Sequence, residues 1–101
     1  MREEDSEREI QQVLGRLTGS LLRAVESASV QEEAVWYDEC LDRLNALGAA
    51  LESSFDLLKV RSFVASFEAE LASFPWQGNE SMQVRRDLSA LAELVRNYSA
   101  Q

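Results

Sequence analysis

The sequence predicts an all-α protein, an up-down antiparallel bundle of about four helices arranged as two helical hairpins. Apolar residues recur at alternating spacings of three and four in four separate runs, which is the pattern of helices with one buried face. The chain has only one proline and four glycines, and its composition is 46% hydrophobic and 28% charged. A chain of 101 residues with this composition is expected to form a single helical domain, 1–101.

We expect the first helix over residues 7–27, after a flexible acidic N-terminus at 1–6. Ser6 and Glu9 have the spacing of a capping box, in which a hydroxyl and a carboxylate satisfy free backbone N–H groups. The apolar residues then step by four and three along one face. This ladder is Ile10, Leu14, Leu17, Leu21, Ala24 and Ala28, widened by Val13, Leu22 and Val25.

A second capping box, from Ser29 to Glu32, predicts a new helix that begins near Val30. Its ladder is Val30, Ala34, Tyr37, Leu41, Leu44, Gly48 and Leu51. The apolar phase changes after Ser54, which predicts a break and then a third helix. The third ladder is Leu57, Val60, Val64, Phe67, Leu71 and Phe74. The alternative is one long helix over 30–73, since neither a proline nor a glycine pair interrupts that range.

The strongest break in the chain is expected at residues 74–79. Pro75 disfavours helical geometry at Phe74, and Gly78 with Asn79 permits a tight reversal. The last helix is expected from about Glu80 to Tyr98, with Asn79 as its cap. Its stripe is Val84, Leu88, Leu91, Val95 and Tyr98. Short connections between helices of this length favour antiparallel neighbours.

Charge and composition exclude several classes of function. Eighteen acidic and ten basic residues give a net charge of −8, which repels nucleic acids and anionic lipid surfaces. No stretch approaches the ~20 apolar residues of a membrane span, so we expect a cytoplasmic protein that binds neither nucleic acid nor membrane. The single cysteine, Cys40, cannot form an intrachain disulfide, which agrees with a reducing compartment. Nine arginines to one lysine favour a bacterial source.

The residues that usually carry out catalysis are missing from the sequence. There is no histidine, hence no imidazole base, no Ser-His-Asp triad and no His-containing metal pattern. Asp38 and Asp42 lie one helical turn apart and leave an enzyme based on carboxylates as an alternative. We expect no enzymatic activity, no cofactor and no metal ion.

An acidic segment around Trp36 is the first candidate protein-binding site. Five acids and two aromatics lie between Glu32 and Asp42, and an indole ringed by carboxylates is typical of a contact site for a basic partner. The contact residues on this interpretation are Glu33, Trp36, Tyr37 and Asp38. In the alternative interpretation Trp36, Cys40 and Leu47 form a strip covered by a neighbouring helix, which is favoured because large aromatics are usually buried.

The third helix supplies a second candidate surface, because it is apolar on most of its faces. We expect it either to be central in the bundle or to be covered by a partner, and a homodimer would complete its core. The candidate contact residues here are Phe63, Phe67, Phe74 and, in the following loop, Trp76. Gly15 and Gly19 form a smooth strip on the first helix, which predicts close packing by another helix within the chain or the dimer.

These features together predict a protein that acts by binding another protein. The first hypothesis is a regulator that sequesters or inhibits its target, such as an anti-activator of a transcription factor. The alternatives are an immunity protein or antitoxin that neutralises a cationic toxin, and a small secretion chaperone that holds an amphipathic helix. A structural subunit of a larger assembly represents a different class.

Overall fold

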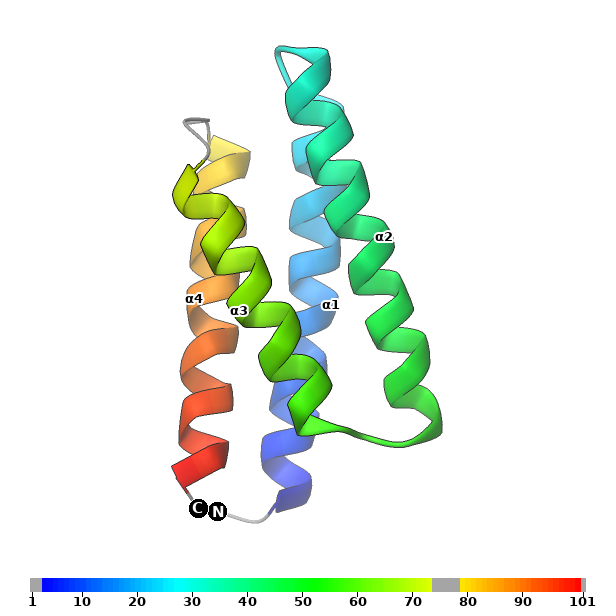
Figure 1. Cartoon of the computed structure of the whole chain (residues 1–101), viewed down its shortest axis with the longest axis vertical. Helices are drawn as coiled ribbons and strands as arrows, with labels where there is room; N and C mark the ends of the chain where they lie inside the picture. Colours follow the sequence, from blue (N-terminus) through cyan, green and yellow to red (C-terminus); the bar gives the residue numbers. More distant parts are fainter. Residues whose placement is uncertain (1–2, 74–78, 101) are drawn as a thin grey trace.

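Four helices run alternately up and down the molecule, as predicted (Figure 1). The computed structural model describes residues 3–73 and 79–100, which form α1 (Glu3–Ser27), α2 (Gln31–Ser53), α3 (Leu57–Ser73) and α4 (Asn79–Ala100). The described residues contain no strand. The two hairpins, α1 with α2 and α3 with α4, lie against each other, and α1 begins at the end of the bundle where α4 finishes.

The helices are packed unequally. α1 packs most extensively, against α4 on one side and α2 on the other, whereas α3 packs moderately on α4 and only lightly on α2. α3 makes no backbone contact with α1, and Figure 1 shows it lying at an angle across the front of the bundle. One broad side of α3 is therefore left without a helical neighbour.

The predicted apolar ladders form the core. The buried side chains of α1 and α4 are Ile10, Val13, Leu14, Leu17, Leu21, Ala24, Val84, Leu88, Leu91, Ala92 and Val95. Those of α2 and α3 are Trp36, Tyr37, Cys40, Leu41, Leu44, Leu47, Leu51, Val60, Val64, Phe67 and Leu71. The outer faces of α1, α2 and α4 are mostly polar, and none of the described helices combines the length and the apolar character needed to cross a membrane.

The first helix starts earlier than predicted. α1 begins at Glu3, so the residues expected to form a flexible segment are helical from position 3, and Ser6 lies inside the helix. Ser6 is only 5% exposed because it stands four residues before Ile10, on the same inward face. The prediction that Ser6 caps the helix is therefore wrong.

The second predicted capping box is also wrong, although the helix begins within one residue of the expected start. Val30 occupies the cap position with extended backbone angles, φ −127° and ψ 151°, and no side chain caps this end. The Val30 carbonyl accepts the N–H of Ala34 at 3.2 Å, which closes the first turn. Ser29 lies one residue too early to cap α2.

Residues 54–56 separate α2 from α3, which excludes one continuous helix over 30–73. Ser54 has extended backbone angles, φ −163° and ψ 125°, and ends α2 where the break was predicted. Asp56 caps α3: its Oδ1 accepts the N–H of Leu58 at 3.0 Å, and its carbonyl accepts the N–H of Val60 at 3.3 Å. This cap was not predicted.

α4 begins at Asn79, so this residue is the first of the helix. The sequence pattern predicted that it would lie one position earlier, as the cap. The loop predicted at 74–79 lies mostly outside the described residues, and with it Phe74 and Trp76.

At its C-terminal end, α4 is joined to α1 by a hydrogen bond. The hydroxyl of Tyr98 donates to Oε1 of Glu7 at 3.4 Å.

Candidate protein-binding surface

Aromatic rings join α2 to α3 in the interior of the bundle. Trp36 meets Tyr37 edge-on, with ring centroids 5.1 Å apart at 61°, and meets Phe67 of α3 at 5.5 Å and 71°. Phe63 continues the cluster one turn earlier on α3, 5.6 Å from Phe67. Such edge-to-face pairs add about 1 kcal/mol each to the area that the rings bury.

Trp36 belongs to a packed strip and not to an exposed contact site. Its side chain is 8% exposed, and Cys40 and Leu47 on the same side of α2 are 1% and 7% exposed. α3 covers this side of α2, which confirms the packed-strip interpretation. Tyr37 and Phe67, at 0% and 2% exposure, are also buried and offer no free surface to a partner in this fold.

Tyr37 points across the bundle toward α4. Burial is the main cause that raises the pKa of its phenol above the ordinary value of 10.0. A hydrogen bond with Ser81 and the positive charge of Arg85 oppose the shift, whereas the charge of Glu33 adds to it. The phenol is therefore neutral near pH 7 and acts as a polar core group.

The acidic residues are concentrated on α2. This helix carries six carboxylates and one guanidinium, a net charge of −5, while α3 and α4 are each neutral. Asp38 is exposed as expected, and Glu33 is half-buried. Glu32, Glu39 and Asp42 form an exposed row with Val35 along the outer side of α2. We call these three acids the acidic row.

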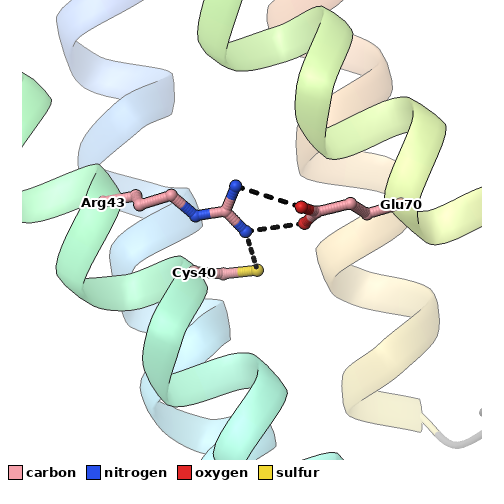
Figure 2. A network of polar contacts seen from close by, with 3 residues as sticks. All are labelled: Cys40, Arg43 and Glu70. Carbon is pink, nitrogen blue, oxygen red and sulfur yellow. Dashed lines mark hydrogen bonds and ion pairs between the residues drawn. The ribbon is translucent and has the colours of Figure 1, made fainter.

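Figure 2 shows the polar contact that joins α2 to α3. Arg43 donates to both carboxylate oxygens of Glu70, at 3.1 Å and 2.6 Å, and its Nη2 also donates to the sulfur of Cys40 at 3.4 Å. The hydrogen bond to Glu70 is the main reason that the pKa of Arg43 is raised. The pair is charge-assisted and bidentate, and it is a direct polar contact between α2 and α3.

Cys40 is chemically quiet in this environment. Burial raises the pKa of its thiol from 9.0 to about 11, although Arg43 acts in the opposite direction. A thiol with this pKa is almost entirely protonated near neutral pH, and the protonated form is a poor nucleophile and a poor metal ligand. Cys40 acts as a small core residue.

A shallow groove lies between α2 and α3, on the side of the Arg43 contact that leads to residues 54–56. Its volume is about 450 Å³, and it is broadly open to solvent. Its apolar walls are Ala46, Leu47, Ala50, Leu58 and Phe63. Lys59 and Arg43 stand at its edges, and Leu58 is 68% exposed. We call this hollow the α2–α3 groove. It adjoins the acidic row at Ala46, which lies one turn after Asp42 on α2.

The two glycines predicted to pack against a helix do not do so within the described chain. A Cβ atom built at Gly15 would meet nothing within 4 Å, and one at Gly19 would meet only the flexible guanidinium of Arg23 at 3.6 Å. Gly15 and Gly48 instead border a hollow of about 620 Å³ between α1 and α2. Close packing of these glycines within the described chain is therefore excluded, and close packing in a dimer stays a prediction.

A buried polar cluster between α1 and α4 was missed at the sequence level. The Ser20 hydroxyl donates to Asp87, which also accepts a hydrogen bond from Gln83 at 3.1 Å; Arg23 donates to Ser20 at 3.3 Å. Asp87 is 6% exposed. Asp87 lies three residues after Val84 on the inward stripe of α4, and this spacing could have predicted that its carboxylate is buried. Among the described residues, no three His, Cys, Asp or Glu side chains are grouped to hold a metal ion.

Comparison of the chain with protein-family models, with curated proteins and with solved structures finds no match. Of the predicted contact residues, the structure leaves Asp38 exposed and Glu33 and Phe63 half-buried. The exposed features that remain are the acidic row, the α2–α3 groove and the outer side of α3.

Proposed function

We propose that the protein is a non-enzymatic regulator that binds another protein and sequesters or inhibits it, as an anti-activator does with a transcription factor. The observation that supports this is that an exposed acidic row on α2 adjoins the apolar α2–α3 groove, where Ala46 follows Asp42 by one turn. The proposal includes a cytoplasmic location and a homodimer.

The chemistry of this surface defines the partner. Exposed apolar side chains such as Leu58, beside a groove with apolar walls, suit the apolar face of a helix. Carboxylates at Glu39 and Asp42 would steer lysine and arginine side chains on the same partner. We therefore propose a partner that presents an amphipathic helix with basic residues at one end.

A second candidate function is supported by the charge of α2. Its net charge of −5 is more than half of the net charge of the chain, which favours an immunity protein or antitoxin that neutralises a cationic toxin. Charge pairs on an exposed surface are screened over about 8 Å at physiological salt. Binding that weakens steeply with salt supports the antitoxin, and binding that is nearly independent of salt supports the groove-centred regulator.

The test is capture of the partner from a lysate of the source organism with two variants and one control. Ala46→Arg fills the groove, Asp42→Lys reverses one charge of the acidic row, and Ser89→Arg places the same new charge on the exposed side of α4. A partner that is retained by the wild type and Ser89→Arg but lost by Ala46→Arg uses the groove. We expect Ala46→Arg to bind the partner at least about tenfold more weakly than the wild type, which is a loss of ~1.4 kcal/mol in binding free energy.

The captured protein must then lose its own activity when one equivalent of the purified chain is added. Retention of that activity, or equal capture by the wild type and Ala46→Arg, contradicts the proposed regulator. Each variant is first checked for a cooperative thermal transition, since all three positions are exposed and the fold is expected to tolerate them.

A further inference from the structure

The outer side of α3 has the pattern of a second helix-packing face. The inward ladder of α3 is Val60, Val64, Phe67 and Leu71, all buried. On the opposite side, exposed residues repeat at spacings of four and three: Leu58, Ser62, Ala65, Ala69 and Ala72. We call these five residues the α3 seam. None of them is charged, and spacings of four and three form a continuous stripe along a helix.

Leu58 contributes the largest exposed apolar side chain of this face, and its contact with water is unfavourable. It is 68% exposed, more than any other large apolar side chain among the described residues, where the next is Val30 at 50%. α3 is also the helix with no backbone contact to α1 and little to α2. Covering Leu58 would remove apolar surface from water, which is the main favourable contribution to protein association.

We propose that the α3 seam is the site where a second copy of this chain docks, with the two α3 helices antiparallel about a two-fold axis at Ala65. In this register Leu58 of each copy packs on Ala72 of the other, and the two Ala65 residues meet at the axis. Small side chains at the centre let the helices approach closely, and Leu58 fills the space at each end. The interface is self-complementary, as a two-fold dimer requires.

Charge complementarity selects this orientation. Arg61 and Glu68 are exposed and lie on the same flank of the α3 seam, two turns apart. Antiparallel pairing about Ala65 brings Arg61 of each copy opposite Glu68 of the other, so two ion pairs form. Parallel pairing would instead set this flank against Ser66 and Ser73, which carry no charge. The antiparallel arrangement is therefore preferred.

The distribution of net charge also favours α3 as the shared helix. α1 carries a net charge of −3 and α2 one of −5, so two copies that met through these helices would repel each other. α3 and α4 are neutral, but the outer side of α4 is more polar and includes Arg86, Glu93 and Arg96. α3 alone combines neutrality with an uncharged seam.

The α3 seam specifies the interface of the homodimer that the proposed function includes, and so rests on that proposal. The oligomeric state can be measured without any partner protein. Leu58 and Ser62 belong to the α3 seam and also border the α2–α3 groove, so the second copy and the partner protein would compete for these residues. A monomeric variant that still binds the partner would separate the two proposals.

The test is the oligomeric state of the purified full chain, by sedimentation equilibrium over the micromolar range. The wild type is expected to associate reversibly to a dimer. Ala65→Arg sets two guanidinium groups together at the axis and is expected to give a monomer, whereas the matched control Ala49→Arg, an exposed alanine on α2, leaves the dimer intact. Helical content and cooperative unfolding confirm that each variant is folded.

A charge swap tests the register itself. Arg61→Glu and Glu68→Arg each set like charges opposite one another twice and should weaken the dimer roughly tenfold. The double variant restores both ion pairs with the charges exchanged and should recover most of the affinity. A wild type that stays monomeric overturns the proposal, as does a swap without recovery. A dimer abolished by Gly15→Arg but not by Ala65→Arg would assign the contact to α1 and overturn it too.

Discussion

Arg43 on α2 and Glu70 on α3 form a bidentate ion pair, at 3.1 Å and 2.6 Å, which joins two lightly packed helices (Figure 2). Phe63 contacts Phe67 of the aromatic cluster and also lines the α2–α3 groove. Arg43 lines the same groove, so the ion pair, the aromatic cluster and the groove adjoin one another.

We predict that this ion pair contributes less than about 1 kcal/mol to stability. Its side chains are 44% and 37% exposed, so water screens the attraction and ordering both side chains costs entropy. Urea unfolding of Arg43→Ala, Glu70→Ala and the double variant gives the coupling energy directly. A coupling of several kcal/mol would mean that the pair holds the bundle together instead of positioning α3.

Trp36→Ala should destabilise the protein by about 3–5 kcal/mol, because it removes a buried indole and leaves a cavity between Tyr37 and Phe67. The free energy of unfolding of a domain is about 5–15 kcal/mol in total, so the variant should melt at a much lower temperature or lose cooperative unfolding. Thermal and urea unfolding followed by circular dichroism measure the change.

The control for this substitution is the neighbouring residue. Val35 is 48% exposed, so Val35→Ala should change stability by no more than about 0.5 kcal/mol. If Trp36→Ala instead unfolds like the wild type, the indole does not pack as the structure shows, and the exposed-contact interpretation of Trp36 would regain its basis.

The number and order of the helices could be predicted because the ladders are long. From Ile10 to Leu21, and again from Val60 to Leu71, each apolar step repeats the same face, so local errors average out. The helix ends could not be predicted in the same way, because a cap depends on the backbone conformation of one residue and not on a repeated pattern. Ser6 has the side chain of a cap but lies on the inward face, whereas Asp56 was overlooked although it directly precedes an apolar run.

The surface was harder to predict than the fold, because it depends on which helix covers which side. Trp36 lies off the main ladder of α2, and the sequence does not say whether α3 reaches it; the ring of Phe67 settles the matter. Gly15 illustrates the opposite error. Its lack of a side chain permits close packing, but the α1–α2 crossing leaves a hollow beside it.

Cys40 should make the protein less stable in alkali. Its folded-state pKa of about 11 exceeds the ordinary value of 9.0, so the stabilising effect of burying the neutral thiol is complete below pH 9 and is lost as the pH rises through 11. The loss approaches about 3 kcal/mol. Tyr37, whose pKa is also raised, adds to the loss above pH 10. Cys40→Ala should show a shallower fall in unfolding free energy between pH 9 and 11.

A thiol reagent provides an independent check of the same environment. At pH 8 the native protein should react with a disulfide reagent far more slowly than the unfolded chain, since the thiol is both buried and protonated. Rapid reaction of the native state would show that α2 and α3 separate readily around Cys40, and the predicted pH dependence would then fail as well.

Gly15→Ala should stabilise the protein by about 0.5–1 kcal/mol. Glycine in a helix interior costs this much relative to alanine, and a Cβ at Gly15 meets no atom within 4 Å. Gly48→Ala, on the opposite wall of the same hollow, is expected to behave alike because its Cβ also enters open space. Urea unfolding at low protein concentration measures both. If Gly15→Ala lowers stability only at concentrations where the chain associates, a second copy occupies this hollow, and the α3 seam would lose its place as the dimer interface.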